Sequence, residues 1–171
     1  MKLNLSDFDL ENLLTSIEEL FQVQAQSKDL KLIFDRDRDL PKFIHSDEKK
    51  IYQVLVNLIG NAIKFTKQGS VILRVKQQEI TASNKSQILF AIEDTGVGIA
   101  STEIDSLFKA FVQAQAGTKF NQGTGLGLAI SQKFIQLMGS QIRVQSTLNK
   151  GSIFSFEIGV NLPQSVPLPS E

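Results

Sequence analysis

The chain has 171 residues, of which 42% are hydrophobic, and this size and composition predict one domain with one sizeable core. Its 18 basic residues balance its 18 acidic ones, which argues against a nucleic-acid binder. The sequence contains no uninterrupted apolar stretch of about 18 residues, so no membrane-spanning segment is predicted. The chain has no cysteine and only one histidine, His45, so it predicts no disulfide, no thiolate nucleophile and no multi-histidine metal cluster.

The spacing of apolar residues predicts both strands and helices along the chain. Strands are predicted where apolar and polar residues alternate, and helices where apolar residues recur every three or four positions. Asp47 is predicted to cap the second helix, and Gly139 to end the last one. In chain order the predicted elements are a short strand within 1–9, a helix at 10–27, a strand at 30–35, a helix at 47–65, strands at 71–78 and 87–93, helices at 102–108 and 126–138, and strands at 141–146 and 152–159.

This order of elements is compatible with helices stacked on one face of a mixed sheet. Residues 109–125 have weak periodicity and few large apolar side chains, so we interpret them as a long functional loop. Three of the four prolines lie within the last nine residues, which indicates a linker at 161–171 that follows a domain of residues 1–160.

The helix predicted at 47–65 has two distinct faces. Asn57, Asn61 and Lys64 form a polar stripe about 110° round the helix from the apolar one. Amide oxygens suit Mg²⁺ and a lysine ammonium suits phosphate, but a polar face that touches solvent or a neighbouring loop explains the pattern equally well. The apolar stripe, predicted to face the core, consists of Ile51, Leu55, Leu58, Ala62 and Phe65.

An Asp-Thr-Gly-Val-Gly-Ile segment at 94–99 follows the strand predicted at 87–93. Its glycines, Gly96 and Gly98, allow the backbone to approach a ligand closely, and the Asp94 carboxylate could accept the exocyclic amine of adenine. The alternative is a simple turn between two elements. An aspartic protease would need two such carboxylates, and the chain has one copy of the motif.

A Gly-Thr-Gly-Leu-Gly-Leu segment at 123–128 opens the helix predicted at 126–138. A glycine-rich turn into a helix start presents free N–H groups, which is typical of phosphate binding. The segment lacks the Gly-Lys-Ser/Thr of a Walker loop, and it lacks the strand that precedes a Rossmann turn. A flexible hinge is the alternative interpretation.

Four segments in this order resemble the N box, first glycine box, F box and second glycine box of the histidine-kinase ATPase domain, within the GHKL superfamily. The resemblance covers roughly residues 3–160. It implies the Bergerat-type ATP-binding fold, which is an α/β (α+β) two-layer sandwich. In this fold a mixed, mostly antiparallel sheet of about five strands packs against three helices. The segments are Asn-Leu-Ile-Gly-Asn-Ala-Ile-Lys-Phe-Thr at 57–66, Asp-Thr-Gly-Val-Gly-Ile at 94–99, Leu-Phe-Lys-Ala-Phe at 107–111 and Gly-Thr-Gly-Leu-Gly-Leu-Ala-Ile at 123–130.

The resemblance also implies ATP and Mg²⁺ as cofactors and a role for each motif residue. Asn57, Asn61 and Lys64 would form the catalytic group, in which Asn61 holds Mg²⁺ and Lys64 faces the phosphates. Asp94 would bind the adenine amine. The other nucleotide-binding residues would be Gly96, Gly98 and Ser152 around the adenine, and Lys119, Gly123, Thr124, Gly125, Leu126 and Gly127 around the phosphates.

Residues 109–125 would form the lid over ATP, anchored at its root by Phe108 and Phe111. Gln122 stands where the family usually has glycine, so closure of the lid is expected to differ. Lys119 is the only basic residue of the lid after Lys109, so any lid contact to the γ-phosphate would come from it.

Position 57 bears on the choice between a kinase and a hydrolase. Gyrases, chaperones and mismatch-repair ATPases of the superfamily commonly have a glutamate there, which activates water as a general base. An asparagine amide cannot accept a proton at neutral pH. We therefore expect transfer of the γ-phosphoryl group to an external nucleophile and not hydrolysis.

The sequence is accordingly interpreted as the cytoplasmic ATP-binding domain of a two-component sensor histidine kinase, possibly a hybrid one. The phospho-accepting histidine would lie on a dimerisation domain outside this chain, because His45 is expected to be an ordinary loop histidine. A response-regulator receiver domain would be a further partner. The alternatives are a stand-alone GHKL ATPase or anti-sigma-type serine kinase, and a non-enzymatic interaction module.

Overall fold

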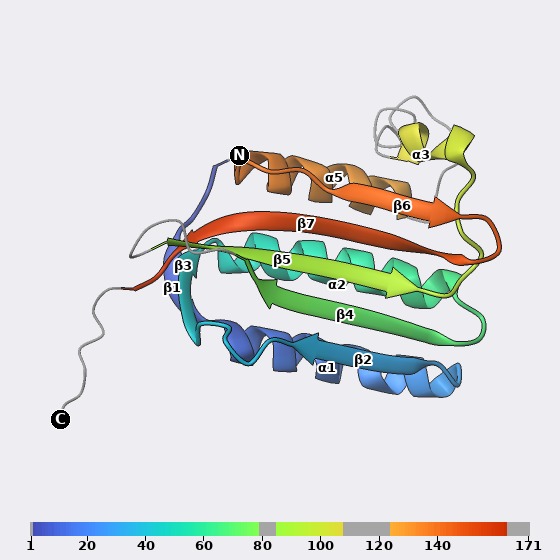
Figure 1. The fold of residues 1–171 in the computed structure, drawn as a ribbon, viewed down its shortest axis with the longest axis horizontal. Helices are drawn as coiled ribbons and strands as arrows, with labels where there is room; N and C mark the ends of the chain where they lie inside the picture. Colours follow the sequence, from blue (N-terminus) through green and yellow to red (C-terminus); the bar gives the residue numbers. More distant parts are fainter. Residues whose placement is uncertain (1, 79–84, 108–123, 164–171) are drawn as a thin grey trace.

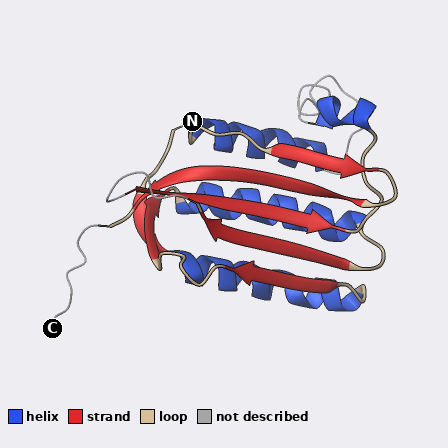
Figure 2. Ribbon diagram, in the orientation of Figure 1, coloured by secondary structure: helices blue, strands red, loops and turns tan. Residues whose placement is uncertain are grey.

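The computed structural model describes residues 2–78, 85–107 and 124–163, which form two layers (Figures 1 and 2). One layer is a sheet. The other, behind it in Figure 1, consists of α1 (Leu10–Ser27), α2 (Glu48–Phe65) and α5 (Thr124–Leu137). The short helix α3 (Ser101–Leu107) lies beyond one end of this layer. The predicted two-layer α/β fold is therefore confirmed.

Within the described residues the sheet has seven strands in the order β1-β3-β7-β5-β4-β2, with β6 also pairing with β7. Strands β2 and β4 are parallel, and the other pairs are antiparallel. The short strands β1 and β3 join the larger five-stranded part through one bridge, His45 to Asn161. The strands are β1 (Ser6–Asp9), β2 (Lys31–Arg36), β3 (Phe43–Ser46), β4 (Ser70–Gln77), β5 (Lys85–Asp94), β6 (Arg143–Thr147) and β7 (Gly151–Asn161).

The core lies between the sheet and the three long helices. Alternate residues of β5 point into it, and the ring of Phe90 stacks on that of Phe156 in β7 with 5.1 Å between centroids. Four of the five apolar residues predicted to face the core from α2 are buried, but Phe65 is 46% exposed. Phe65 is the last residue of α2, where the two layers end, and helical spacing alone does not locate that boundary.

The predicted elements all form, and after the first strand their ends lie within two residues of the prediction. One strand, β3, was not predicted. His45 lies in it and was expected in a loop, so that expectation is wrong: Ile44 is buried, and His45 pairs with Asp7 of β1. The predicted loop at 109–125 lies outside the described residues except for its last two, which belong to the first turn of α5.

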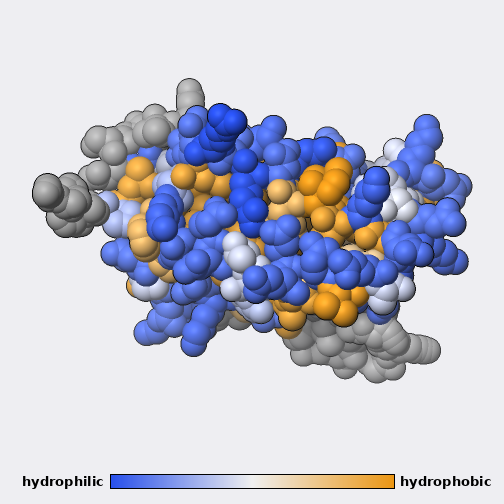
Figure 3. Space-filling model, turned by 90° about the horizontal axis from the view of Figure 1, so that it is seen from below, coloured by the Kyte–Doolittle hydropathy of each residue, from blue (hydrophilic) through white to orange (hydrophobic). Residues whose placement is uncertain are grey.

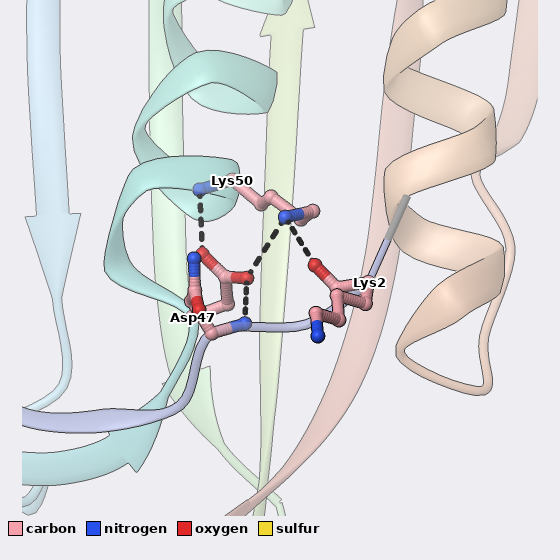
Figure 4. A network of polar contacts seen from close by, with 4 residues as sticks. Lys2, Asp47 and Lys50 are labelled. Carbon is pink, nitrogen blue, oxygen red and sulfur yellow. Dashed lines mark hydrogen bonds and ion pairs between the residues drawn. The ribbon is translucent and has the colours of Figure 1, made fainter.

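Asp47 fastens the residues ahead of β1 to the start of α2 (Figure 4). Its carboxylate is 1% exposed and accepts hydrogen bonds from the Lys50 backbone N–H (3.1 Å), the Asn4 backbone N–H (2.8 Å) and the Lys50 ammonium (3.1 Å). The ammonium also donates to the Lys2 carbonyl at 2.9 Å. Burial alone would raise the pKa of Asp47, but these donors outweigh it and hold the pKa below its usual value.

The surface over α1 and β2 is mostly hydrophilic, with apolar side chains emerging between the charged ones (Figure 3). The exposed large apolar residues of these two elements are Leu20, Val23 and Ile33. Scattered exposure of this kind is ordinary for a single domain and indicates no site. Among the residues that the structure describes, no helix has both the length and the apolar character needed to cross a bilayer.

Candidate functional site

A cavity of about 240 Å³ lies where β5 and α2 end, at the right-hand end of the sheet in Figure 1. Its wall comes from α2, the end of β5 and the loop after it, α3, α5 and β7. Four residues predicted to bind nucleotide line it: Asn61, Asp94, Gly98 and Ser152. The rest of the wall is mainly apolar and includes Leu58, Ala62, Phe65, Ile99, Leu128 and Phe154.

Asp94 is the last residue of β5 and is 8% exposed. Burial raises the pKa of its carboxyl, and the neighbouring Glu93 adds to this, while hydrogen bonds from the backbone N–H groups of Gly96 and Ser152 partly offset it. The Gly96 bond measures 2.8 Å. A buried carboxylate with so few donors is poised to accept a further hydrogen bond from a ligand.

The loop after β5 packs against the turn between β6 and β7. Asn149 donates its backbone N–H to the Val97 carbonyl at 2.7 Å, and Ile99 donates its backbone N–H to the Ser146 hydroxyl at 2.7 Å. Gly96 is confined as well, because a Cβ there would lie 2.5 Å from the Phe65 carbonyl oxygen. Glycine is therefore required at position 96 by a close backbone contact beside the cavity.

Gly98 has a φ of +74°, and a Cβ there would lie 2.1 Å from the Thr147 carbonyl oxygen. Gly139 has a similar φ of +83° but open space around it. Gly98→Ala is expected to destabilise the fold by about 1–3 kcal/mol more than Gly139→Ala, because only Gly98→Ala adds overpacking to backbone strain. Urea unfolding of both variants measures this difference. Equal losses of stability would mean that the turn between β6 and β7 moves to accommodate the added methyl group at little cost in free energy.

The polar stripe of α2 does not act as one unit. Asn61 lines the cavity, but Asn57 turns to α5, where its Nδ2 donates to the Gly127 carbonyl (3.3 Å) and to the Ser131 hydroxyl (3.0 Å). Lys64 is exposed and outside the cavity wall, with its ammonium 5.5 Å from the centroid of the Phe65 ring.

The second glycine box is described only in part. Thr124, Gly125 and Leu126 form the first turn of α5, but their side chains lie outside the described residues. Gly127 packs against Asn57. The predicted positions Phe108, Phe111, Lys119 and Gly123 are also outside the described part of the chain.

Three polar residues of this region were not singled out from the sequence. Glu103 of α3 lines the cavity, Ser146 joins β6 to the loop after β5, and Ser131 joins α5 to α2. Ser131 had a local signal, because it lies four residues after Gly127 and so shares its helix face. For Glu103 and Ser146 no local pattern exists, since their contacts are with distant segments.

The arrangement suits a flat heteroaromatic ring that carries an exocyclic amine. Apolar side chains would cover the faces of the ring, and the Asp94 carboxylate would accept a hydrogen bond from the amine. Beside Gly96, and outside the cavity wall itself, the Thr66 hydroxyl is fully buried and has no hydrogen-bond partner among the described residues. The Asn61 amide in the same wall offers an oxygen of the kind that binds Mg²⁺.

A model of the family described as "Histidine kinase-, DNA gyrase B-, and HSP90-like ATPase" matches residues 46–162. The chain is 36% identical over 160 residues to hybrid signal transduction histidine kinase B of Dictyostelium discoideum, covering 93% of the chain and 8% of that protein. It is 35% identical over 159 residues to the sensory/regulatory protein RpfC of Xanthomonas campestris, covering 92% and 22%. The figures for the histidine-protein kinase BarA of Escherichia coli are 36% over 160 residues, covering 93% and 17%.

Solved structures of histidine kinases are similar as well. Full-length ShkA in complex with AMPPNP matches with a TM-score of 0.79 at 33% identity, covering 98% of the chain and 33% of ShkA. The kinase AdeS of Acinetobacter baumannii matches with a TM-score of 0.69 at 27% identity, covering 92% and 68%. The nucleotide-free catalytic domain of ThkA matches with a TM-score of 0.67 at 26% identity, covering 91% and 95%.

Proposed function

The chain belongs to the family of histidine kinase-, DNA gyrase B- and HSP90-like ATPases and is the ATP-binding domain of a histidine kinase, and from this premise we propose that it binds Mg²⁺–ATP in the cavity and donates the γ-phosphoryl group to a histidine on a separate dimerisation domain. The chain spans only 8%, 22% and 17% of the three curated relatives named above. The activity and partners of the whole kinase are therefore part of the proposal.

The buried carboxylate of Asp94 is the observation that carries the proposal. It is the one strongly buried acidic group of the cavity wall among the described residues, and its pKa is raised chiefly by that burial, which a hydrogen bond from an adenine amine would help to offset. The rest of the cavity wall is mainly apolar, which suits the faces of a purine ring. ShkA, which matches 98% of the chain, was solved with an ATP analogue.

Asn61 is proposed to hold Mg²⁺ through its amide oxygen. The described residues contain no cluster of three or more acidic, histidine or cysteine side chains that could hold a metal. Mg²⁺ commonly takes one or two protein groups and completes its shell with phosphates and water, so a single amide oxygen suffices beside a triphosphate. Lys64 and the glycine-rich start of α5 are proposed to face the phosphates.

Transfer needs no general base from this domain. When bound, Mg²⁺ neutralises the charge that develops on the transferring phosphoryl group. The side chains of this chain would hold the adenine, orient the phosphates and keep the γ-phosphoryl group open to an external nucleophile. Asn57 cannot activate water, because its amide accepts no proton and both of its Nδ2 contacts go to α5.

The acceptor is proposed to lie outside the chain. The only histidine of this chain, His45, precedes α2, whereas Asn61 lies 13 residues beyond the first residue of that helix. At ~1.5 Å per residue this separation is roughly 20 Å, and reacting atoms must approach to about 3–3.5 Å. The proposed partners are a histidine-bearing dimerisation domain and a response-regulator receiver domain. We propose that the domain works in the cytoplasm, where ATP is supplied.

Nucleotide titration of the purified chain with and without Mg²⁺ tests the proposal. The wild type should bind ATP more tightly with Mg²⁺, and Asn61→Ala should lose most of that gain because the metal loses its protein ligand. Asn12→Ala is the matched control, since Asn12 is an exposed residue of α1, far from the cavity. An unchanged Mg²⁺ effect in Asn61→Ala would refute the metal assignment. Repeated release of phosphate by the wild type would favour a stand-alone ATPase instead.

A further inference from the structure

The side-chain amide of Asn57 connects α2 to α5 through its nitrogen and is held within α2 through its oxygen. Its Nδ2 donates to the Gly127 carbonyl at 3.3 Å and to the Ser131 hydroxyl at 3.0 Å, both in α5. Its Oδ1 accepts a hydrogen bond from Gln53, one turn earlier in α2, at 3.3 Å. An amide with two donors and two acceptor sites is thus largely satisfied without any ligand.

Ser131 is the buried end of this connection. It is 0% exposed, and its neighbours on α5 include the apolar residues Leu128 and Ile135, which are 3% and 0% exposed. A buried hydroxyl requires a hydrogen-bond partner, and Asn57 supplies it. Loss of the Asn57 amide would therefore leave the buried Ser131 hydroxyl without this partner, whereas loss of the Ser131 hydroxyl would leave the half-buried Asn57 with only the Gly127 carbonyl on α5.

Gly127 allows the two helices to approach each other. A Cβ at this position would lie 3.3 Å from the Asn57 Cγ, which is tighter than an ordinary contact. The missing side chain therefore brings the Gly127 carbonyl within reach of the Asn57 amide. A glutamate at position 57 would have no N–H to donate to this carbonyl.

The connection lies directly beside the cavity. Leu58 follows Asn57, Leu128 follows Gly127, and both leucines line the cavity wall. Asn61, one turn beyond Asn57 on α2, lines it too. A shift of α5 along α2 would therefore change the distance between the glycine-rich helix start and Asn61.

We propose that Ser131 and Asn57 are positioning residues for phosphate binding, which hold the glycine-rich start of α5 in register with Asn61. This inference rests on the proposed function. In it, Asn57 does not contact the reacting atoms but acts through Gly127 and Ser131. Asp94, at the adenine end of the cavity, takes its hydrogen bonds from Gly96 and Ser152 and not from this connection.

The experiment compares affinities for ATP and for adenosine, each with Mg²⁺ present. Ser131→Ala should weaken ATP binding about 2- to 12-fold, the range expected for one neutral hydrogen bond, and leave adenosine binding within twofold of the wild type. Asn57→Ala should weaken ATP binding at least as much. The double variant should bind ATP no more weakly than Asn57→Ala, because both changes break the same connection.

Ser86→Ala is the matched control. Ser86 is 1% exposed and donates a hydrogen bond to Gln77, but it lies at the other end of β5 from Asp94. Removal of the Ser86 hydroxyl should lower the unfolding temperature as Ser131→Ala does, with no effect on the affinity for ATP or for adenosine. Equal weakening of ATP and adenosine by Ser131→Ala, no weakening, or additive effects with Asn57→Ala would each overturn this inference alone. A wild type that binds no ATP would overturn the proposed function itself.

Discussion

Asp94→Asn is expected to weaken ATP binding by roughly 10- to 150-fold, the loss of about 1.5–3 kcal/mol that accompanies one hydrogen bond to a charged group. The substitution keeps the shape of the side chain and removes its charge. The amide oxygen can still accept the hydrogen bond from Gly96, so the loop after β5 should keep its conformation. Calorimetric titration of wild type and variant with ATP measures the effect.

Stability should change in the opposite sense. Burial raises the pKa of Asp94, so the ionised carboxylate opposes folding at neutral pH, and this opposition disappears as the pH falls through the raised pKa. Asp94→Asn removes the buried charge, and we expect its free energy of unfolding at pH 7 to be equal to or above that of the wild type. The residue is thus retained at some expense of stability, as functional groups often are.

Asp35→Asn controls for the chemical change alone. Asp35 is an exposed residue of β2, and its carboxylate is 4.0 Å from the Arg74 Nε. Its substitution should leave both ATP affinity and stability close to wild type. ATP affinity in Asp94→Asn within twofold of wild type would remove Asp94 from the binding site and with it the main support for the proposed orientation of the adenine.

Asp47→Ala is expected to destabilise the fold by about 3–5 kcal/mol, the range for removing one partner of a buried charge pair. Three donors lose their acceptor at once: two backbone N–H groups and the Lys50 ammonium, whose side chain is 14% exposed. The amino-terminal residues should detach from α2 as well, because the Asn4 bond is among those lost (Figure 4). Urea unfolding at pH 7 measures the loss.

Asp9→Ala is the control, because Asp9 caps α1 in the same way but holds no buried ammonium. Its carboxylate accepts from the Asn12 N–H at 3.0 Å and lies 3.7 Å from an exposed lysine, Lys42. The expected loss is about 1 kcal/mol, which is typical of an N-cap. Similar losses at Asp9 and Asp47 would show that the buried ion pair contributes nothing beyond capping.

The pH dependence of the Asp47 contribution follows from its lowered pKa. A carboxylate with a lower pKa in the folded state stabilises the fold above its unfolded pKa and loses that contribution as the pH falls through the folded value. The difference in stability between the wild type and Asp47→Asn should therefore be constant near neutral pH and shrink below about pH 3.9. A difference that persists at lower pH would contradict the assignment.

Local patterns along the chain were sufficient for most of the fold. The 47–65 helix was predicted from its apolar spacing and from Asp47 at its start, because both depend on neighbours within one or two turns. The glycine box at 94–99 was recognisable for a similar reason: backbone with positive φ or close contacts requires glycine at fixed spacings, whatever surrounds it. Asn61 and Asp94 were named from local motifs and Ser152 from the family resemblance, and the structure brings all three to one cavity.

Other features depend on which distant segments meet. Strand β3 has four residues and too little pattern to be predicted, and it exists because β1 and β7 offer it pairing partners. The stripe of α2 divides into Asn61 at the cavity and Asn57 at α5 because α5 packs beside it, 70 residues later in the chain. The spacing of apolar residues along a helix or strand indicates only which of its sides is buried. Which other element packs against that side is determined by long-range packing.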